Sequence, residues 1–313
     1  MVLSAWKWRH IAKGALTWVP PLDAWRRRRI STGGTNRARY CYSVWLRHLV
    51  TLQSCGFEIR DARVGELGPG DSIGTGLAAL LSGAEHYIGL DVVHLSAQLD
   101  LRTIFDELVR LYERREPIPD NSEFPRVSPR LKSYEFPVGL IEWTGFHKRT
   151  ELIRADLEQG LDQGRMIHYQ APWNSVDDVA IGSLDLIFSQ AVLEYASSLE
   201  EVYRAMSMWL KKGGYASHVV DFSAHGLSPF WNGHWAYSNR EWRLARGCRE
   251  VFLNRETISS HIACATRFGF EIKLLEKDYR TDGLNTAQLS SGFQALDPQD
   301  LQTRGAVMVL RKI

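Results

Sequence analysis

Glycine and carboxylate residues stand close together between residues 66 and 91, at a spacing suited to binding a ligand through the backbone. Residues 66–76 read ELGPGDSIGTG, with an acid, Glu66, at the front and four glycines behind it. Glycine lets the backbone turn sharply and lets a ligand approach it closely. A second carboxylate, Asp91, follows Gly70 by 21 residues, the separation at which an acid accepts hydrogen bonds from ribose hydroxyls in nucleotide-binding folds. The pattern therefore predicts a site for a cofactor that contains a ribose.

Two cofactor classes use this geometry, and the sequence favours one of them. Nicotinamide dinucleotides need the pattern G-x-G-x-x-G and a helix N-terminus that receives the pyrophosphate. Gly68 and Gly70 fit this pattern, but Ile73 stands at the third glycine position. S-adenosylmethionine carries an ammonium and no phosphate, so an acid at Glu66 would attract it, whereas the same acid would repel a pyrophosphate. We expect S-adenosylmethionine, with NAD(P) and a plain strand–helix turn as the alternatives.

Candidates for a general base lie in and after the apolar run SHVVDF, residues 217–222. Ligands of open α/β sheets bind beyond the carboxyl ends of the strands, and a base raises the rate of transfer to a hydroxyl by about 10²–10⁴-fold. We expect His225 as the base, Asp221 as the group that orients it or binds acceptor hydroxyls, and His234 as a second candidate base. Alternatively, Asp221 caps a turn, and the aromatic residues of 230–242 pack in a core instead of against sugar rings. No HxxxH or HExxH spacing occurs here, so we expect no metal.

Strands and helices alternate along the chain as in a doubly wound α/β sheet. ARVGEL and HYIGLDVV predict strands on either side of a helix of small residues, and HYQ predicts a third strand. DLIFSQ and YASHVVDF predict two more strands around an amphipathic helix at 199–210, which Gly213 and Gly214 would end. Asn254 is expected to cap a further helix that ends at Gly269, and FEIKLLEK and AVMVLRK predict the last two strands.

The order of these motifs resembles that of class I S-adenosylmethionine-dependent methyltransferases over roughly residues 60–275. ELGPGDSIGTG is followed by DLIFSQAVLEY and then by WLKKGGYASHVVDF. The seven expected strands are similar to the Rossmann-like methyltransferase sheet, whose last strand is antiparallel. More narrowly, ARYCYSVWLRHL, HYQAPW and NGHWAYSNREW resemble methyltransferases of bacterial surface-polysaccharide biosynthesis. This resemblance implies O-methylation of a sugar hydroxyl in a surface glycan or its precursor, with a lipid or a small metabolite as the alternative acceptor.

The resemblance also implies ten cofactor-binding residues, all near strand ends: Glu66, Gly68, Gly70, Ser72, Asp91, Tyr169, Gln170, Ala171, Ser189 and Gln190. The first four would surround the methionine part, and Asp91 would hold the ribose. The next three would flank the adenine, and the last two would line the floor beneath the sulfonium. The chain departs from the family pattern at Tyr169 and Gln170, where many relatives carry an acid, and at Tyr195, where a histidine is common. The adenine contacts and the role of Tyr195 therefore stay open.

Two segments lie outside the sheet pattern. We assign residues 1–58 to an N-terminal extension that ends in a capping helix, and residues 59–313 to a methyltransferase domain with an insert at about 96–164. The insert combines two helical patterns with a proline-rich stretch, which we interpret as a helical lid over the acceptor pocket or, alternatively, as an oligomer contact. Residues 1–30 mix four tryptophans with seven basic residues, a composition suited to the surface of an anionic membrane. A helix packed on the core with solvated arginines is the alternative.

The composition is that of an ordinary globular chain of 313 residues, with 44% hydrophobic residues and a net charge of +2. A charge so close to zero excludes a whole-molecule field for nucleic acid. No apolar run reaches the ~18 residues that a membrane span needs. The four cysteines form no CxxC pair, which favours a cytoplasmic setting, peripheral to the inner membrane face if residues 1–30 bind lipid. An NAD(P)-dependent oxidoreductase and a catalytically silent scaffold remain as other function classes.

Overall fold

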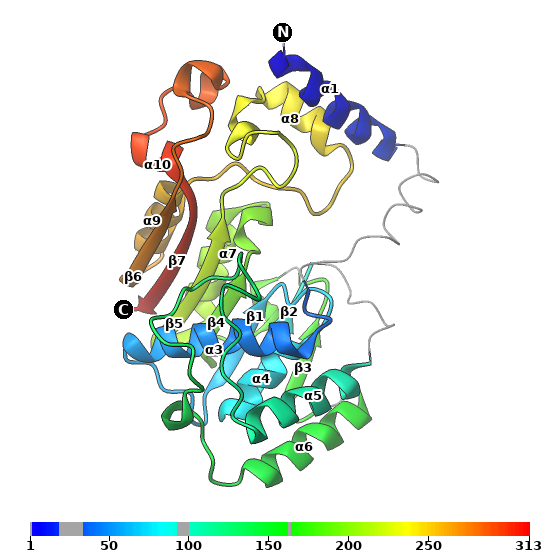
Figure 1. The fold of residues 1–313 in the computed structure, drawn as a ribbon, viewed down its shortest axis with the longest axis vertical. Coiled ribbons are helices and arrows are strands. Elements are labelled where there is room, and N and C mark those ends of the chain that lie inside the picture. Colours follow the sequence, from blue (N-terminus) through cyan, green and yellow to red (C-terminus); the bar gives the residue numbers. More distant parts are fainter. Residues whose placement is uncertain (1, 19–33, 93–99, 162–163, 174) are drawn as a thin grey trace.

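The computed structural model describes residues 2–18, 34–92, 100–161, 164–173 and 175–313. Within these residues, a seven-stranded sheet with the strand order β3-β2-β1-β4-β5-β7-β6 forms the centre of the molecule (Figure 1). Strands β1 to β5 pair in parallel, whereas β7 lies between β5 and β6 and pairs antiparallel with both. This arrangement confirms the expected Rossmann-like methyltransferase sheet. The strands are β1 (Arg63–Leu67), β2 (His86–Leu90), β3 (Ile167–Gln170), β4 (Leu184–Gln190), β5 (Leu210–Asp221), β6 (Phe270–Tyr279) and β7 (Thr303–Lys312).

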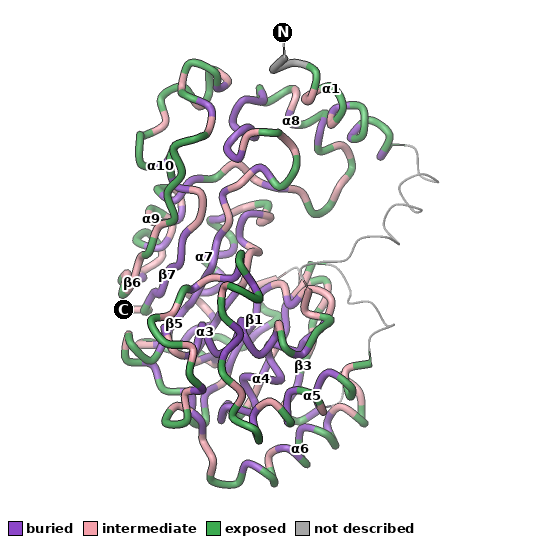
Figure 2. The backbone as a smooth tube through the Cα atoms, viewed as in Figure 1, coloured by how far each residue is buried: buried purple, intermediate pink, exposed green. Residues whose placement is uncertain are grey.

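Helices cover both faces of the sheet. Successive residues of a strand point to opposite faces, so Phe188 joins the core on one side and its neighbour Ile187 the core on the other. Figure 2 shows buried residues concentrated in the sheet and in the helices next to it. The first layer contains α3 (Ala38–Ser54), α4 (Gly74–Ser82), α5 (Leu101–Glu113) and α6 (Phe146–Gln159), and the second contains α7 (Leu199–Trp209) and α9 (Ile258–Arg267). Short 3-10 helices in the connections are η2 (Val138–Leu140), η3 (Val176–Asp178) and η4 (Leu193–Tyr195).

A smaller group of elements lies beyond the carboxyl end of β5 (Figure 1). The chain leaves β5 through η5 and α8, and α1 packs side by side with α8. Ile11 of α1 joins Tyr237, Trp242 and Leu253 in a core of their own. The elements of this group are α1 (Val2–Ala15), η1 (Leu16–Trp18), η5 (Gly233–Ala236), α8 (Asn239–Arg246), η6 (Thr286–Gln288), η7 (Ser291–Phe293) and α10 (Pro298–Gln302).

The described part of the insert at about 96–164 is helical, as expected, but its helices do not cover the strand ends. α5 and α6 pack against each other and against α4, and α5 also contacts α3. Both helices lie at the opposite end of the molecule from α1 and α8 (Figure 1). The proline-rich stretch between them is held along α3 by Arg47, which donates hydrogen bonds to the backbone oxygens of Pro119, Val127 and Pro129. These helices are therefore a layer of the fold, and a lid over the acceptor pocket does not follow from them.

Two predicted helix boundaries are wrong. Helix α7 ends at Trp209 because Leu210 already has extended backbone, so the pair Gly213–Gly214 lies inside β5 and does not end the helix. Asn254 does not cap α9: the cap is Thr257, whose side chain accepts a hydrogen bond from the backbone of Ser260. Gly269 follows the end of α9 with a φ of +78°, as expected of a glycine after a helix.

Candidate active site

The glycine turn after β1 lies against the ends of β2 and β4. Gly68 has a φ of +63° and its backbone N–H donates to Leu90 at 2.8 Å. A Cβ at Gly68 would lie 2.7 Å from the side chain of Val192, which follows β4, so the close approach requires glycine. Gly70 has a φ of +80° and its N–H points to the carboxylate of Asp91, with a distance of 3.4 Å to Oδ2. The two residues that the 21-residue spacing singled out thus lie next to each other, and the binding of a ribose by Asp91 stays a prediction.

Asp91 joins the glycine turn to the end of β3. Its side chain accepts hydrogen bonds from the N–H groups of Gly70 and, at 2.7 Å, of Val92. Its own backbone N–H donates to the backbone oxygen of Gln170 at 3.0 Å, and Trp173 donates to its backbone oxygen at 2.9 Å. The carboxylate is half-buried at the carboxyl edge of the sheet. Residues from β1, β2 and β3 that were predicted to bind the cofactor are therefore brought together there.

Glu66 lies beneath the turn and is almost completely buried, with 3% of its surface exposed. Its carboxyl group accepts a hydrogen bond from the hydroxyl of Tyr87 at 2.6 Å. Burial raises the pKa of Glu66 to about 8 although the hydrogen bond from Tyr87 acts in the opposite direction. Gly76 makes room for the ring of Tyr87, since a Cβ there would lie 2.1 Å from it.

Ser72 has a structural role that the sequence did not indicate. It is fully buried, and its hydroxyl donates to the backbone oxygen of Thr35, while the hydroxyl of Thr35 accepts from the N–H of Ser72 at 3.1 Å. The N–H of Gly74, the first residue of α4, donates to the hydroxyl of Ser72 at 3.0 Å. Ser72 thus ties the glycine turn to the segment before α3. Thr35 was missed because only the fold brings it to the turn.

The ends of β3 and β4 carry the remaining predicted cofactor residues. Tyr169 pairs with Gly89 of β2 and is half-buried, whereas Gln170 is exposed and Ala171 is half-buried. Ser189 is fully buried, and its hydroxyl forms a hydrogen bond of 2.8 Å with His218. A ligand at the edge of the sheet could therefore reach Tyr169, Gln170 and Ala171. It could not reach the buried side chain of Ser189.

A histidine from α3, also missed by the sequence analysis, supports the end of β4. The two ring nitrogens of His48 lie 3.1 Å from Oε1 of Gln190 and 2.8 Å from the hydroxyl of Ser217. His48 is fully buried, and burial lowers its pKa to about 4, so the ring is neutral at physiological pH. A neutral ring that accepts from Ser217 must donate to Gln190, which fixes the orientation of that amide. Gln190 is partly exposed at the carboxyl edge.

Three side chains after β4 and β5 form a connected group on the acceptor side. The hydroxyl of Tyr195 lies 2.8 Å from Nδ1 of His225, and Nε2 of His225 lies 3.5 Å from a carboxylate oxygen of Asp221. The side chains of His225 and Asp221 are 26% and 42% exposed, so solvent and ligands can reach them. The structure brings together the two residues predicted as base and orienting acid and adds Tyr195, whose role was open. His225 has a φ of +44°, a conformation that is costly outside glycine and that clusters at functional sites.

Glu194 is a buried carboxyl group beside this cluster that the sequence analysis did not single out. It is 1% exposed, and neither of its carboxyl oxygens has a hydrogen-bond partner within the described chain. Burial raises the pKa of Glu194 well above its ordinary value, and the neighbouring Asp221 carboxylate raises it further. Glu194 therefore holds its proton in the folded chain.

His234, the second candidate base, is buried with 1% exposure and packs on Trp235 with a distance of 4.5 Å between ring centroids. Burial lowers its pKa to about 3. A base without an exposed edge cannot reach an acceptor, so His234 is excluded as the general base. Trp231, Trp235 and Trp242 are buried as well, which favours core packing for the segment 230–242 over stacking on sugar rings.

No protein-family model matches the chain, and no curated protein matches it. Among solved structures, an S-adenosylmethionine dependent methyltransferase from Mesorhizobium loti is 18% identical, with a TM-score of 0.42 over 84% of this chain and 96% of that chain. An SAM-dependent methyltransferase from Methanosarcina mazei is 13% identical, with a TM-score of 0.42 over 84% and 97%. Geranyl diphosphate C-methyltransferase from Streptomyces coelicolor A3(2), in complex with Mg²⁺, geranyl diphosphate and S-adenosyl-L-homocysteine, is 10% identical, with a TM-score of 0.44 over 86% and 79%.

The fold is the Rossmann-like methyltransferase fold. The order of the strands in this chain, with β7 antiparallel between β5 and β6, identifies it independently of these low similarities. The groups at the glycine turn also fit S-adenosylmethionine chemically: they offer bare backbone at Gly68 and Gly70, a carboxyl group at Glu66 and a carboxylate at Asp91.

Proposed function

We propose that this chain is an S-adenosylmethionine-dependent methyltransferase. The observation that carries the proposal is the contact of Gly70 with the Asp91 carboxylate at the carboxyl edge of a sheet with this strand order. Ligands of open α/β sheets bind at that edge, and an acid after β2 is placed to accept hydrogen bonds from ribose hydroxyls. Glu66 then stands beneath the turn as the partner for an ammonium group.

The start of α4 argues against the alternative, a dinucleotide. A pyrophosphate binds to free N–H groups at a helix N-terminus. Here the N–H of Gly74, the first residue of α4, already donates to the hydroxyl of Ser72. A phosphate would find this donor occupied and the carboxyl group of Glu66 beneath the turn. The NAD(P)-dependent oxidoreductase therefore becomes the weaker hypothesis.

The proposed acceptor is a sugar hydroxyl of a surface glycan or its precursor. When bound, S-adenosylmethionine supplies an activated methyl group on a sulfonium, so the chain has to align the acceptor and remove its proton. The exposed pair of His225 and Asp221 at the end of β5 supports a hydroxyl acceptor, since a hydroxyl has to lose a proton on methylation whereas a tertiary amine or a thioether has none to lose. The sugar itself is proposed from the resemblance of the sequence motifs.

Calorimetric titration with S-adenosylhomocysteine and with NADH tests the cofactor. We expect micromolar binding of S-adenosylhomocysteine and none of NADH. Asp91→Ala should weaken the affinity by about 10–100-fold, because hydrogen bonds to charged groups contribute about 1.5–3 kcal/mol each. Glu271→Ala, on the outer strand β6, is the matched control. Binding of NADH alone would overturn the proposal. Transfer of a labelled methyl group into isolated glycan, lipid and small-metabolite fractions then identifies the acceptor.

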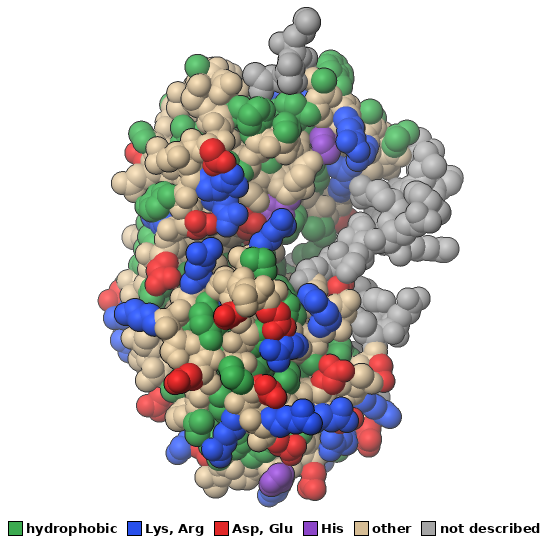
Figure 3. All heavy atoms as spheres, in the orientation of Figure 1, with side chains coloured by type: hydrophobic (Ala, Val, Ile, Leu, Met, Phe, Trp, Pro, Cys, Tyr) green, Lys and Arg blue, Asp and Glu red, His purple; other side chains and the backbone are tan. Residues whose placement is uncertain are grey.

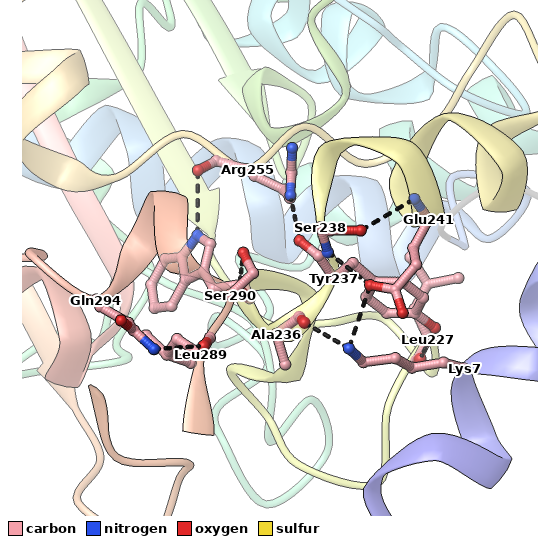
Figure 4. Close-up of polar contacts among 11 residues, drawn as sticks. Lys7, Leu227, Ala236, Tyr237, Ser238, Glu241, Arg255, Leu289, Ser290 and Gln294 are labelled. Carbon is pink, nitrogen blue, oxygen red and sulfur yellow. Dashed lines mark hydrogen bonds and ion pairs between the residues drawn. The ribbon is translucent and has the colours of Figure 1, made fainter. Parts of the chain in front are cut away.

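We also propose that α1 holds the enzyme at the surface of an anionic membrane. Its inner side is anchored, because Lys7 donates to the backbone oxygen of Ala236 at 2.6 Å and pairs with Glu241 at 3.3 Å (Figure 4). On its outer side, Trp8 is 66% exposed beside the exposed cations Arg9 and Lys13, and the sequence of α1 contains no acid. Exposed tryptophan with cations suits the headgroup region of anionic lipid.

The rest of the molecule does not share this character. Figure 3 shows acidic and basic side chains interspersed over the lower half of the visible face. No helix in the described chain has the length and apolarity needed to cross a bilayer. Part of the predicted basic and aromatic stretch, residues 19–30, lies outside the described residues. The proposal therefore rests on α1 and its neighbour η1, where Leu16 and Trp18 are 53% and 52% exposed.

Co-sedimentation with lipid vesicles tests the membrane contact. We expect binding to vesicles that contain about 30% anionic lipid and little binding to neutral vesicles, because each cation near the surface contributes about 1 kcal/mol. The double variant Arg9→Glu, Lys13→Glu should lose at least about tenfold in affinity. The double variant Arg240→Glu, Arg243→Glu on α8 is the control for a general charge effect. Equal binding to neutral and anionic vesicles would contradict the proposal.

A further inference from the structure

One ring nitrogen of His225 is covered by a hydrogen bond, and the other faces a carboxylate. Nδ1 faces the hydroxyl of Tyr195 at 2.8 Å, and Nε2 faces Asp221 at 3.5 Å. A general base has to come within hydrogen-bond reach of the proton that it removes. Nδ1 of the imidazole can therefore receive a proton from the acceptor only through Tyr195, the group that already touches it.

We propose that Tyr195 is a catalytic residue that takes the proton of the acceptor hydroxyl and passes its own proton to His225. This inference rests on the proposed function, and it names the side chain that touches the acceptor. The hydroxyl of Tyr195 has no other hydrogen-bond partner within the described chain. Its oxygen therefore has a lone pair available for an acceptor after donating to His225. Tyr195 is half-buried, so it is accessible and yet shielded from bulk water.

The direction of the relay follows from the neighbours of the ring. The relay requires the hydrogen on Nε2, the ring nitrogen that faces Asp221, because a carboxylate oxygen accepts hydrogen bonds. Nδ1 is then bare and has to accept, which makes Tyr195 the donor.

The elements around Tyr195 hold it rigidly. Asn254 donates from its side-chain amide to the backbone oxygens of Leu193 at 2.8 Å and Ala196 at 3.2 Å, on either side of Tyr195 in the chain. The rings of Tyr195 and His225 meet edge to face, with centroids 5.5 Å apart. The strained φ of His225 is thus stabilised by contacts that fix its ring against Tyr195. The relay is preorganised before an acceptor arrives.

The proton balance of the relay is closed. As the acceptor oxygen gains the methyl group, its proton moves to the oxygen of Tyr195. The proton of Tyr195 moves at the same time to Nδ1 of His225, which becomes an imidazolium stabilised by Asp221. Tyr195 is neutral before and after, which matches its environment because burial raises its pKa well above the ordinary value. The imidazolium gives the proton on Nε2 to the Asp221 carboxylate, whose side chain is 42% exposed and releases the proton to solvent.

Nitrogen NMR of histidine-labelled protein tests the relay without an acceptor. The inference requires a protonated Nε2 and a bare Nδ1 in His225 of the wild type. Tyr195→Phe should shift the Nδ1 resonance toward that of a free, unprotonated nitrogen. In Asp221→Asn, the amide can donate to Nε2 and the tautomer should invert. A proton on Nδ1 of the wild type would overturn the proposal.

Kinetics with the acceptor fraction supply the second readout. Tyr195→Phe should lower kcat by about 10²-fold or more, the range of general-base catalysis, with KM changed less than about threefold and binding of S-adenosylhomocysteine intact. Tyr279→Phe on β6 is the matched control. Wild-type kcat in Tyr195→Phe would also overturn the proposal. A wild type that binds S-adenosylhomocysteine and methylates nothing would contradict the proposed function, and the tautomer measurement would still decide the relay.

Discussion

Glu66 is the residue whose protonation is most closely linked to cofactor binding. In the free chain it is protonated up to about pH 8 because its burial disfavours the charge. Pairing with an ammonium group requires the ionised form, so binding of S-adenosylhomocysteine at pH 6.5 should release about one proton. The affinity should then rise by up to tenfold per pH unit until about pH 8. Titration calorimetry in two buffers with different ionisation enthalpies measures the release.

Two variants separate this effect from simple loss of contacts. Glu66→Gln should bind more weakly and release no proton, since the amide cannot ionise. Asp91→Ala should also bind more weakly but should still release the proton from Glu66. Equal proton release by wild type and Glu66→Gln would show that another group ionises on binding.

The positions of single residues could be predicted from the sequence where their spacing along the chain alone determines them. The position of Asp91 directly after β2 belongs to this class, because a strand–turn–helix–strand unit fixes its separation from the glycine turn. The bonds of Thr35 to Ser72 and of His48 to Gln190 do not. Each joins α3 or the segment before it to a distant loop or strand, and no local pattern encodes where that helix crosses the sheet.

Helix α4 depends on glycine at its third residue. A Cβ at Gly76 would lie 2.1 Å from the ring of Tyr87, which the closely packed strand β2 holds in place. Overpacking of a core typically costs about 1–3 kcal/mol, so Gly76→Ala should lower the free energy of unfolding by at least about 2 kcal/mol in urea denaturation. Gly139→Ala, where no atom lies within 4 Å of the added methyl group, should be nearly neutral. Equal stability of both variants would contradict this packing.

Helix α3 organises the proline-rich stretch through Arg47. This guanidinium is fully buried and donates to the backbone oxygens of Pro119, Val127 and Pro129 without a carboxylate partner among these contacts. Arg47→Met would leave these oxygens without their donor, at about 1–3 kcal/mol for each oxygen that water does not reach. We expect a loss of about 2–4 kcal/mol in stability.

Limited proteolysis locates the effect of this substitution. Cleavage in Arg47→Met should become faster within residues 117–137 and stay unchanged in β5. Arg130→Met, which removes an exposed arginine from the same stretch, should behave as the wild type. Cleavage spread evenly over the chain would mean that Arg47 supports the whole domain instead of this segment.

At the scale of elements, the periodic segments were predictable and their ends were not. The apolar stripe of α7 and the strand DLIFSQ were confirmed because burial of one face leaves a clear period in the sequence. The cap of α9 was misplaced by three residues since Asn254 and Thr257 are equally suitable by type, and the packing of η4 uses Asn254. The insert was read as a lid because its length, not its packing partners, is visible in the sequence.

For the whole molecule, buried ionisable groups set the pH of greatest stability. His48, His218, His234 and His261 are neutral in the fold, and burial lowers their pKa values to about 4, 3, 3 and 3. Below pH 6.5 the unfolded chain binds protons that the folded chain refuses, so stability falls with acid. Glu66 has the opposite effect on stability. Between pH 4.5 and about 8 its carboxyl group is protonated in the folded state and ionised in the unfolded state, so stability falls as the pH rises.

Below pH 6.5 the four histidines change the stability more than Glu66 and Glu194, the two carboxyl groups whose pKa values are raised. Above pH 6.5 only these two carboxyl groups change the stability. The midpoint of urea denaturation should therefore be highest near pH 6.5 and lower at both pH 5 and pH 8.5. His261→Gln should flatten the acid side of this curve. A midpoint that is as high at pH 5 as at pH 6.5 would contradict the neutral state of these histidines.

The anchoring of α1 on α8 has a consequence for synthesis of the chain. Lys7 and its partner Ala236 are 229 residues apart in the sequence. At a translation rate of about 5–20 residues per second, α1 waits about 10–50 s on the ribosome before α8 exists. During that time the side that carries Ile11 and Trp6 has no partner and is available to chaperones or to lipid. Docking of α1 onto α8 is thus among the last steps in the folding of the newly synthesised chain.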